Sequence, residues 1–420
     1  MTRRALVPFL VAALFAPAGF ATLAAPDATN ALLSAGHADW ARGDYEGAEK
    51  NFRLAVQEAE KGGDTERIVA AVSQLAELQG KRGKTDGAIA QYKKALALQE
   101  KAYPPNDARL PPTLEGLADL YAATGKFALA SPLYERSLGI IEKSLGPDHP
   151  NLALTLGKLG LSRKQEGKLD ASARAYRRGL EIAEKAFGPQ DMRLVSSLRR
   201  LAGVLSAQGK VAEAEPLYRR LVALREKAPQ TKGSQQALGS ALNELGLALY
   251  RQKKYDEAAT SWKRSLELLE KSLGTSHADV AVVLVNLAAL AETRGKYDEA
   301  EPLYKRALGI QEKALGPNNP EVGAVVNNLA VLYMLQGKAE EAETQCKRAI
   351  AIWEKAPGGG GNDLATALEN YASLLRKTGR EAEAAPLQQR ADTLRGKKPA
   401  PAAAGPAASS TAIPPPKAPR

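Results

Sequence analysis

Residues 295–320 read GKYDEAEPLYKRALGIQEKALGPNNP. Apolar residues recur in this stretch at helical spacing, with Ala300, Tyr304 and Leu308 on one face, which predicts an amphipathic helix. Gly295, at the start, is typical of the left-handed residue that ends a preceding helix. The stretch therefore predicts the second half of a helix-turn-helix unit.

The same turn pattern recurs along most of the chain. It consists of a glycine, usually a lysine, an aromatic or apolar residue, two further residues and then a small residue. Its leading position falls at Gly43, Gly83, Gly125, Gly167, Gly209, Lys253, Gly295, Gly337 and Gly379. Most intervals are 42 residues, and a fixed period of this length indicates an array of similar units. We therefore expect an all-α fold of about nine helix pairs over residues 26–395.

Two further columns follow this period. Five residues after the leading position every unit has alanine or serine, which indicates that two helices cross closely there. Four residues further along, most units have an aromatic residue, such as Tyr134, Trp262 or Tyr304. These aromatic side chains are predicted to pack in the core. Cys346 occupies the same column and is expected to be a buried apolar residue, with a reactive thiol as the alternative. Gln388, in the last unit, is expected to be exposed to solvent.

The two ends of the chain differ from the repeats. Residues 1–25 have Arg3 and Arg4, then an uncharged apolar run and small residues, which predicts a cleaved secretory signal peptide. An uncleaved membrane anchor is the alternative, and it would be the only membrane contact. We thus expect an exported protein that is located in the periplasm. Secretion from the cell and anchoring in the membrane are the alternatives. Residues 396–420 are rich in proline and alanine and are predicted to be a disordered tail.

Charge and composition exclude several classes of function. The net charge is +11, but residues 1–25 carry two of these charges and residues 396–420 carry four. Five positive charges over the 370 residues between them indicate a mixed-charge surface, so no nucleic-acid partner is expected. The single cysteine excludes a disulfide framework.

The rare histidines argue against a metal site or a catalytic site. There are three in the chain, and His149 and His277 fall at equivalent turn positions in different units. They are thus expected to be turn residues that share no metal. No nucleophile, nucleotide or metal motif is present, and the repeats take up almost all of the chain. We expect no cofactor and no enzymatic activity.

At residues 295–320 and 327–333 the chain resembles the tetratricopeptide repeat family, in the 42-residue form found in kinesin light chains and their bacterial relatives. The resemblance implies a right-handed superhelical solenoid. It also implies that the first helix of each pair lines a concave groove, which would suit an extended or helical segment of a partner protein.

The resemblance directs attention to a column on the first helices, nine residues before each leading position. From the third unit on, this column holds Gly116, Lys158, Arg200, Glu244, Asn286, Asn328 and Asn370. Asparagine can donate and accept hydrogen bonds, so these residues are candidates for binding a peptide backbone. Asn243 and Asn327, one residue earlier, are added to them. The alternative is that these asparagines bridge neighbouring helices.

Upstream the column becomes basic. Lys158, Arg199 and Arg200, with Lys164 nearby, would favour an acidic partner segment or a terminal carboxylate if they face the groove. A solvated charged face is the alternative.

The leading hypothesis is a non-catalytic scaffold that binds protein or peptide segments in its groove, in the cell envelope or outside the cell. Two other hypotheses remain open. One is a factor associated with the cell wall or with polysaccharide, and the other is an accessory subunit of an envelope enzyme complex.

Overall fold

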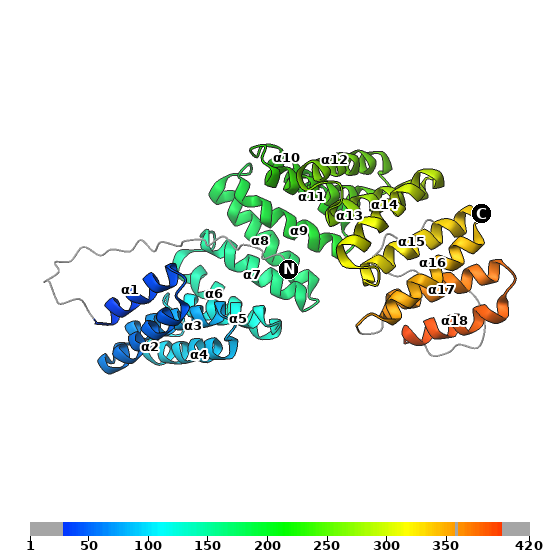
Figure 1. Cartoon of the computed structure of the whole chain (residues 1–420). Helices are drawn as coiled ribbons and strands as arrows, with labels where there is room; N and C mark the ends of the chain where they lie inside the picture. The colour runs from blue at the N-terminus through cyan, green and yellow to red at the C-terminus, as the bar shows by residue number, and fades with distance from the viewer. Residues whose placement is uncertain (1–27, 358–359, 397–420) are drawn as a thin grey trace. The chain divides into compact units, whose positions relative to one another are not determined.

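The computed structural model describes residues 28–357 and 360–396, in which α-helices follow one another in antiparallel pairs (Figure 1). These eighteen helices form nine pairs, which we number as repeats 1 to 9, and the predicted all-α repeat fold is confirmed. The predicted signal peptide, residues 1–25, and all but the first residue of the predicted tail lie outside the described residues. None of the helices in the described part of the chain has both the length and the apolar character that a membrane crossing needs.

The chain divides into two compact units, which are described separately. The first unit extends to Pro147 and holds α1 (Ala28–Ala41), α2 (Tyr45–Gly62), α3 (Thr65–Lys81), α4 (Thr85–Ala102), α5 (Pro111–Ala123) and α6 (Phe127–Leu145). The second unit starts at Asp148 and holds α7 (Asn151–Gln165), α8 (Leu169–Phe187), the 3-10 helix η1 (Met192–Leu194), α9 (Val195–Ala207), α10 (Val211–Glu226), α11 (Lys232–Arg251), α12 (Tyr255–Leu273), α13 (Ala278–Thr293), α14 (Tyr297–Leu315), α15 (Pro320–Gln336), α16 (Ala339–Glu354), α17 (Gly361–Lys377) and α18 (Glu381–Leu394).

The turn inside each pair has the predicted left-handed residue. The glycines at the leading positions have positive φ, for example 72° at Gly295 and 75° at Gly337. Repeat 6 has Lys253 there instead, with φ of 61°, and it is the one non-glycine residue with positive φ in the described part of the chain. A side chain disfavours this conformation, so Lys253 is held by the fold around it.

The two predicted columns lie in the core. The small residues of the first column, from Ala48 to Ala384, are all fully buried. Trp262 and Cys346, in the second column, are also fully buried, whereas Gln388 is partly exposed as expected. The confirmed burial of the aromatic residues means that they stabilise the repeats and are not available to stack on a ligand.

Helical glycines make room for the large rings, which the sequence columns did not reveal. A Cβ atom on Gly246 of α11 would lie 2.5 Å from Trp262 Nε1, and one on Gly160 of α7 would lie 2.6 Å from Tyr176 Cε1. No side chain fits at such distances, so glycine is needed where the ring crosses the facing helix.

Some of the turns between pairs have a side chain that caps a backbone nitrogen at the start of the next helix. His277 accepts a hydrogen bond at Nδ1 from the backbone nitrogen of Asp279, at 3.1 Å. Asn319, at the equivalent place, accepts one from Glu321 at 2.9 Å, and His149 accepts one from Asn151 at 3.3 Å. These contacts satisfy nitrogens at helix starts that have no partner within the helix. The prediction that His149 and His277 are turn residues is confirmed.

A ladder of ion pairs joins successive even-numbered helices. In seven of the nine described pairs, a basic residue eleven positions after the leading position contacts a glutamate seventeen positions after the previous leading position. We call this set the Arg–Glu ladder, and it consists of Lys94–Glu60, Arg136–Glu100, Arg220–Glu184, Arg264–Glu226, Arg306–Glu270, Arg348–Glu312 and Arg390–Glu354. Most members are partly exposed, so each pair contributes little to the free energy of folding. Their regular pattern favours one alignment of neighbouring repeats.

Candidate functional site

All eight predicted site residues lie on odd-numbered helices of the second unit. Lys158 is on α7, Arg199 and Arg200 are on α9, Asn243 is on α11, Asn286 is on α13, Asn327 and Asn328 are on α15, and Asn370 is on α17. The structure brings some of them into contact and leaves others apart.

Four of the asparagines form two bridges between first helices. Asn286 donates a hydrogen bond from Nδ2 to Oδ1 of Asn243, at 2.8 Å. Asn370 donates in the same way to Asn327, at 3.0 Å. Each bridge joins helices of adjacent repeats, α13 with α11 and α17 with α15. These four asparagines therefore bridge neighbouring helices, which was the alternative to peptide binding in the sequence analysis.

Asn328 differs from the other asparagines. It is partly exposed on α15, and its side chain has no hydrogen-bond partner among the described residues. Its donor and acceptor therefore both face water. Of the five asparagines, Asn328 is the one whose whole amide group is available to a ligand.

A small cleft lies where α9, α10 and α11 meet. Its volume is about 200 Å³, and Arg199, Arg225, Ser240 and Glu244 contribute polar groups to its lining. Arg199 donates from Nε to Oε1 of Glu244, at 2.7 Å. The other carboxylate oxygen of Glu244 is buried and has no partner within the described residues. Burial raises the pKa of Glu244, although the Arg199 pair acts in the opposite direction.

Arg225 is a site residue that the sequence columns missed. It lies on α10, outside the first helices, and is partly buried in this cleft. Within the described part of the chain, it makes no hydrogen bond or ion pair. Burial and the nearby Arg199 both lower its pKa, so the site disfavours its positive charge. An anionic group in the cleft would relieve this penalty.

The remaining members of the column have different surroundings. Arg200 is exposed, and one of its guanidinium nitrogens lies 3.2 Å from where a Cβ on Gly157 would be. Lys158 is partly buried and has an interaction partner, whereas Lys164 is exposed. Gly116, on α5 of the first unit, packs against the ring of Tyr92. The column is therefore not uniform: some positions face solvent and others support the packing.

Buried or partly buried carboxylates form a second set of polar sites, on even-numbered helices. Glu49, Glu215, Glu301 and Glu343 each directly follow the small core residue of their helix. Each accepts hydrogen bonds from a basic residue one turn along its own helix and from a basic residue in the turn of the next repeat. We call these four sets the carboxylate clusters. In each of them the pKa of the glutamate is lowered to about 2.

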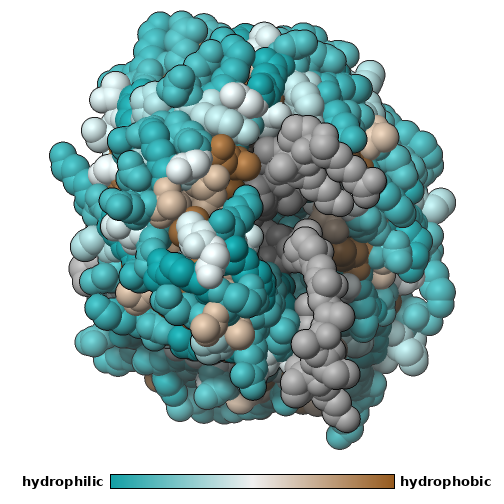
Figure 2. Space-filling model, turned by 90° about the vertical axis from the view of Figure 1, so that its right-hand side faces the viewer, coloured by the Kyte–Doolittle hydropathy of each residue, from teal (hydrophilic) through white to brown (hydrophobic). Residues whose placement is uncertain are grey.

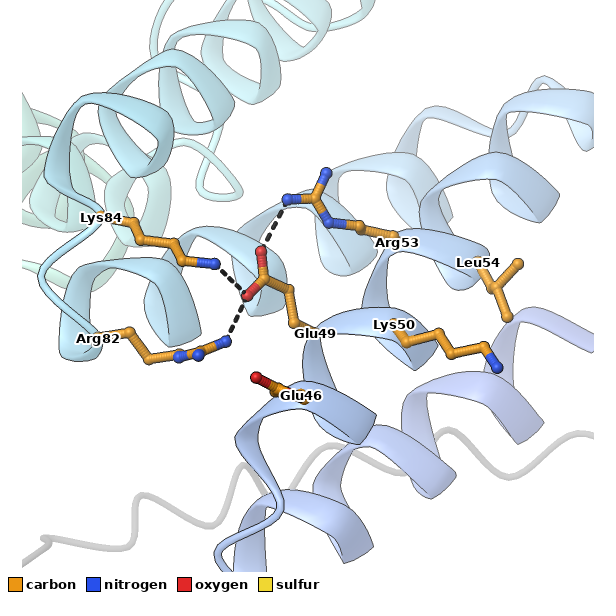
Figure 3. Close-up of a pocket in the computed structure, with 7 residues that line it drawn as sticks. All are labelled: Glu46, Glu49, Lys50, Arg53, Leu54, Arg82 and Lys84. Atoms are coloured by element: carbon orange, nitrogen blue, oxygen red, sulfur yellow. Dashed lines mark hydrogen bonds and ion pairs between the residues drawn. The ribbon is translucent and has the colours of Figure 1, made fainter.

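The cluster of Glu49 lies beside a cleft in the first unit (Figure 3). Arg53 contacts one carboxylate oxygen at 2.7 Å, while Arg82 and Lys84 contact the other at 2.6 and 2.7 Å. Burial alone would raise the pKa of Glu49, but the hydrogen bonds from Lys84 and Arg53 lower it. The cleft has a volume of about 490 Å³ and is also lined by Leu54.

Two buried titratable groups lie outside these sites. Cys346 is fully buried, and burial raises the pKa of its thiol to about 12. Its predicted packing role is confirmed by this burial. Glu292 is 4% exposed, and burial raises its pKa to about 7, although Tyr304 donates a hydrogen bond to it at 3.0 Å.

The described residues contain no group of histidine, cysteine and acidic side chains arranged to hold a metal ion. The face of the molecule in Figure 2 is mostly hydrophilic, and its hydrophobic residues form small groups. Small apolar groups of this kind are normal on protein surfaces, so the described residues of this face show no large apolar patch for a partner.

Comparisons with known protein families agree with the repeat period. A model described as tetratricopeptide repeat matches residues 110–185, 160–227, 238–320 and 321–393, which together make up more than half of the chain. A second model with the same description matches residues 199–272. No curated protein matches the sequence.

Many solved structures are similar to this chain. The apo form of RapI is 12% identical, with a TM-score of 0.62, and the match covers 88% of this chain and 99% of RapI. The apo form of the quorum sensor NprR from B. thuringiensis is 14% identical, with a TM-score of 0.57 and coverage of 88% and 97%. A putative kinesin light chain from Podosopora anserina is 22% identical over 50% of this chain and 97% of its own, with a TM-score of 0.43. At these identities the first two show a shared fold.

Proposed function

Because the chain belongs to the tetratricopeptide repeat family, we propose that it is a scaffold that binds segments of other proteins along its odd-numbered helices. The observation that carries this proposal is the cleft where α9, α10 and α11 meet, in which Arg225 is partly buried without a partner beside Arg199. Partial burial of a cation without a partner is unfavourable, and a carboxylate from a bound segment would offset that penalty.

The asparagines support the same proposal. Asn328 presents an unpaired amide on α15, whereas Asn243 and Asn286 hold each other in place. An amide that can donate and accept binds a peptide backbone without selecting its side chains. Arg225 would thus favour an acidic residue in the partner, and Asn328 would hold the main chain.

Site-specific photo-crosslinking tests this proposal. A photo-reactive residue at position 328 should capture partner proteins. Arg225→Glu should reduce that capture by at least about tenfold, because the new carboxylate would repel the acidic residue of the partner. Lys263, exposed on α12, is the matched control position, because α12 contributes no residue to the lining of the cleft. Equal capture from positions 328 and 263, or capture that Arg225→Glu leaves unchanged, would contradict the proposal.

We further propose that the protein acts after export, in the periplasm of a bacterial cell. The support is the arrangement of residues 1–25, with Arg3 and Arg4 before an uncharged apolar run and small residues at its end. Protein recovered from the envelope fraction should begin near residue 26 when its amino terminus is sequenced. A mature protein that still begins at Met1 in the cytosolic fraction would contradict this assignment.

A further inference from the structure

The four carboxylate clusters differ in their balance of charge. In the cluster of Glu215, Arg219 also contacts Glu257 of the next repeat, so two acids face Arg219 and Lys254. In the cluster of Glu343, Arg380 also contacts Glu383, at 2.7 Å, so two acids face Arg380 and Lys347. The second acid stands four residues after the leading position in both cases.

The cluster of Glu301 follows the same rule. Glu341 holds the equivalent position and acts electrostatically on Lys338, so two acids face Lys305 and Lys338. Three of the four clusters are therefore neutral. In each of them the second carboxylate comes from the following repeat.

The cluster of Glu49 lacks this second carboxylate. Gly87 stands four residues after Gly83, where the other clusters have a glutamate. This cluster also has an additional cation, because Arg82 occupies the position held by Gln252 and Gln336 in two of the other clusters. Three cations thus face one carboxylate.

The excess charge faces an open cleft (Figure 3). Glu46 and Lys50 also line the cleft and offset each other, so the lining as a whole carries two more positive than negative charges. Leu54 provides an apolar edge and is 38% exposed. The side chains of Arg53 and Lys84 are about half exposed and remain accessible from solvent.

We propose that this cleft binds a glutamate or aspartate side chain from an acidic segment of a partner protein, in the place of the carboxylate that Gly87 lacks. Two of the other clusters show which group completes the arrangement, because Glu257 contacts Arg219 and Glu383 contacts Arg380 directly. Charge-assisted hydrogen bonds from arginine and lysine give such a contact its strength. This site lies on α2 and the turn before α4, so it goes beyond the scaffold function proposed for the odd-numbered helices.

The test uses the full chain and a fluorescein-labelled hexaglutamate peptide with blocked ends, with hexaglutamine as the uncharged control. Gly87→Glu supplies the absent carboxylate from within and should weaken hexaglutamate binding about tenfold, which corresponds to the loss of one charge-assisted contact. Gly309→Glu adds the same charge on α14, at an exposed position with nothing near its Cβ, and should leave binding unchanged. Equal weakening by both variants would overturn the proposal, because it would show attraction to net charge alone.

Gly87→Glu could fail to fold, because an added Cβ would lie 3.1 Å from Oε1 of Gln79. A second pair of variants therefore tests the proposal independently of this substitution. Arg53→Gln should also weaken hexaglutamate binding, whereas Arg219→Gln, the equivalent change in repeat 5, should not. No effect of Arg53→Gln would overturn the proposal. Competition assays identify the class of anion: acetate should displace the peptide at least as well as inorganic phosphate, and preferential displacement by phosphate would overturn the carboxylate assignment.

Discussion

Asn286 donates a hydrogen bond to Asn243 over 2.8 Å and so joins α13 to α11, 43 residues earlier in the chain. Asn328, one repeat further on, has no such partner among the described residues. Residues of one sequence column can thus have different structural roles, and mutation should separate them.

Asn286→Ala should lower the free energy of unfolding by about 1 kcal/mol, because it leaves the acceptor of Asn243 without its partner. Asn328→Ala should change it by less than about 0.5 kcal/mol, as expected for a surface substitution. Urea denaturation followed by circular dichroism would measure both. A loss of stability in Asn328→Ala as large as that in Asn286→Ala would show that Asn328 is structural.

Glu292→Gln should stabilise the protein at pH 8. Burial raises the pKa of Glu292 from 4.5 to about 7, so the folded state binds this proton more tightly than the unfolded state. Stability therefore falls as pH rises from about 4.5 to 7, and the full penalty, on the order of 3 kcal/mol, applies above pH 7. Glutamine keeps an acceptor for Tyr304 without the charge. Melting temperatures from pH 4 to 8 should diverge between the two proteins as pH rises, and parallel curves would contradict the raised pKa.

Glu301→Gln should have the opposite pH dependence. Hydrogen bonds from Lys305 and Lys338 lower the pKa of Glu301 from 4.5 to about 2. Its contribution is fully present above about pH 4.5 and is lost as pH falls towards 2. The variant should therefore melt at a lower temperature than the natural protein at pH 7, and the difference should shrink below pH 4. A difference that stays constant with pH would show that packing, and not charge, is responsible.

Lys253→Gly should raise the free energy of unfolding by up to about 1 kcal/mol, because Lys253 has φ of 61° and glycine adopts this conformation without strain. Gly295→Ala is the reverse control, since φ is 72° there, and it should lower stability by a similar amount. Chemical denaturation of both variants checks the pair. Destabilisation by Lys253→Gly would mean that contacts of the lysine side chain outweigh the strain.

Cys346 should not react with iodoacetamide in the folded protein at pH 7.5. Its thiol is fully buried, and burial raises its pKa to about 12, so almost none is ionised. Mass spectrometry should find full labelling in denaturant and little without it. Rapid labelling of the folded protein would show that repeat 8 opens locally.

The sequence predicted the features that depend on local chemistry. Left-handed glycines, buried alanines and the aromatic column follow from the conformation and volume of single residues at a fixed period, as at Gly295 and Ala300. The Arg–Glu ladder could also have been found, because Arg306 and Glu270 recur at fixed offsets in successive repeats. It was missed because the partners belong to different repeats.

The cleft residue Arg225 could not be predicted in this way. Its burial depends on how the irregular loop between α10 and α11 places α11, and no neighbouring repeat has the same loop. The bridging role of Asn286 depends likewise on the spacing of two helices, which a single column does not contain. Such properties arise from packing between elements and not from any one residue.

The Arg–Glu ladder makes the repeats interchangeable parts. Most internal repeats carry a basic group that contacts the repeat before and an acid that contacts the repeat after, as Arg306 and Glu312 do within residues 295–336. A tandem copy of these residues would contain both the basic residue and the glutamate that the ion pairs with its neighbouring repeats require. The array could therefore grow or shrink by whole repeats, through duplication or deletion of one segment of the gene, without any new interface having to arise.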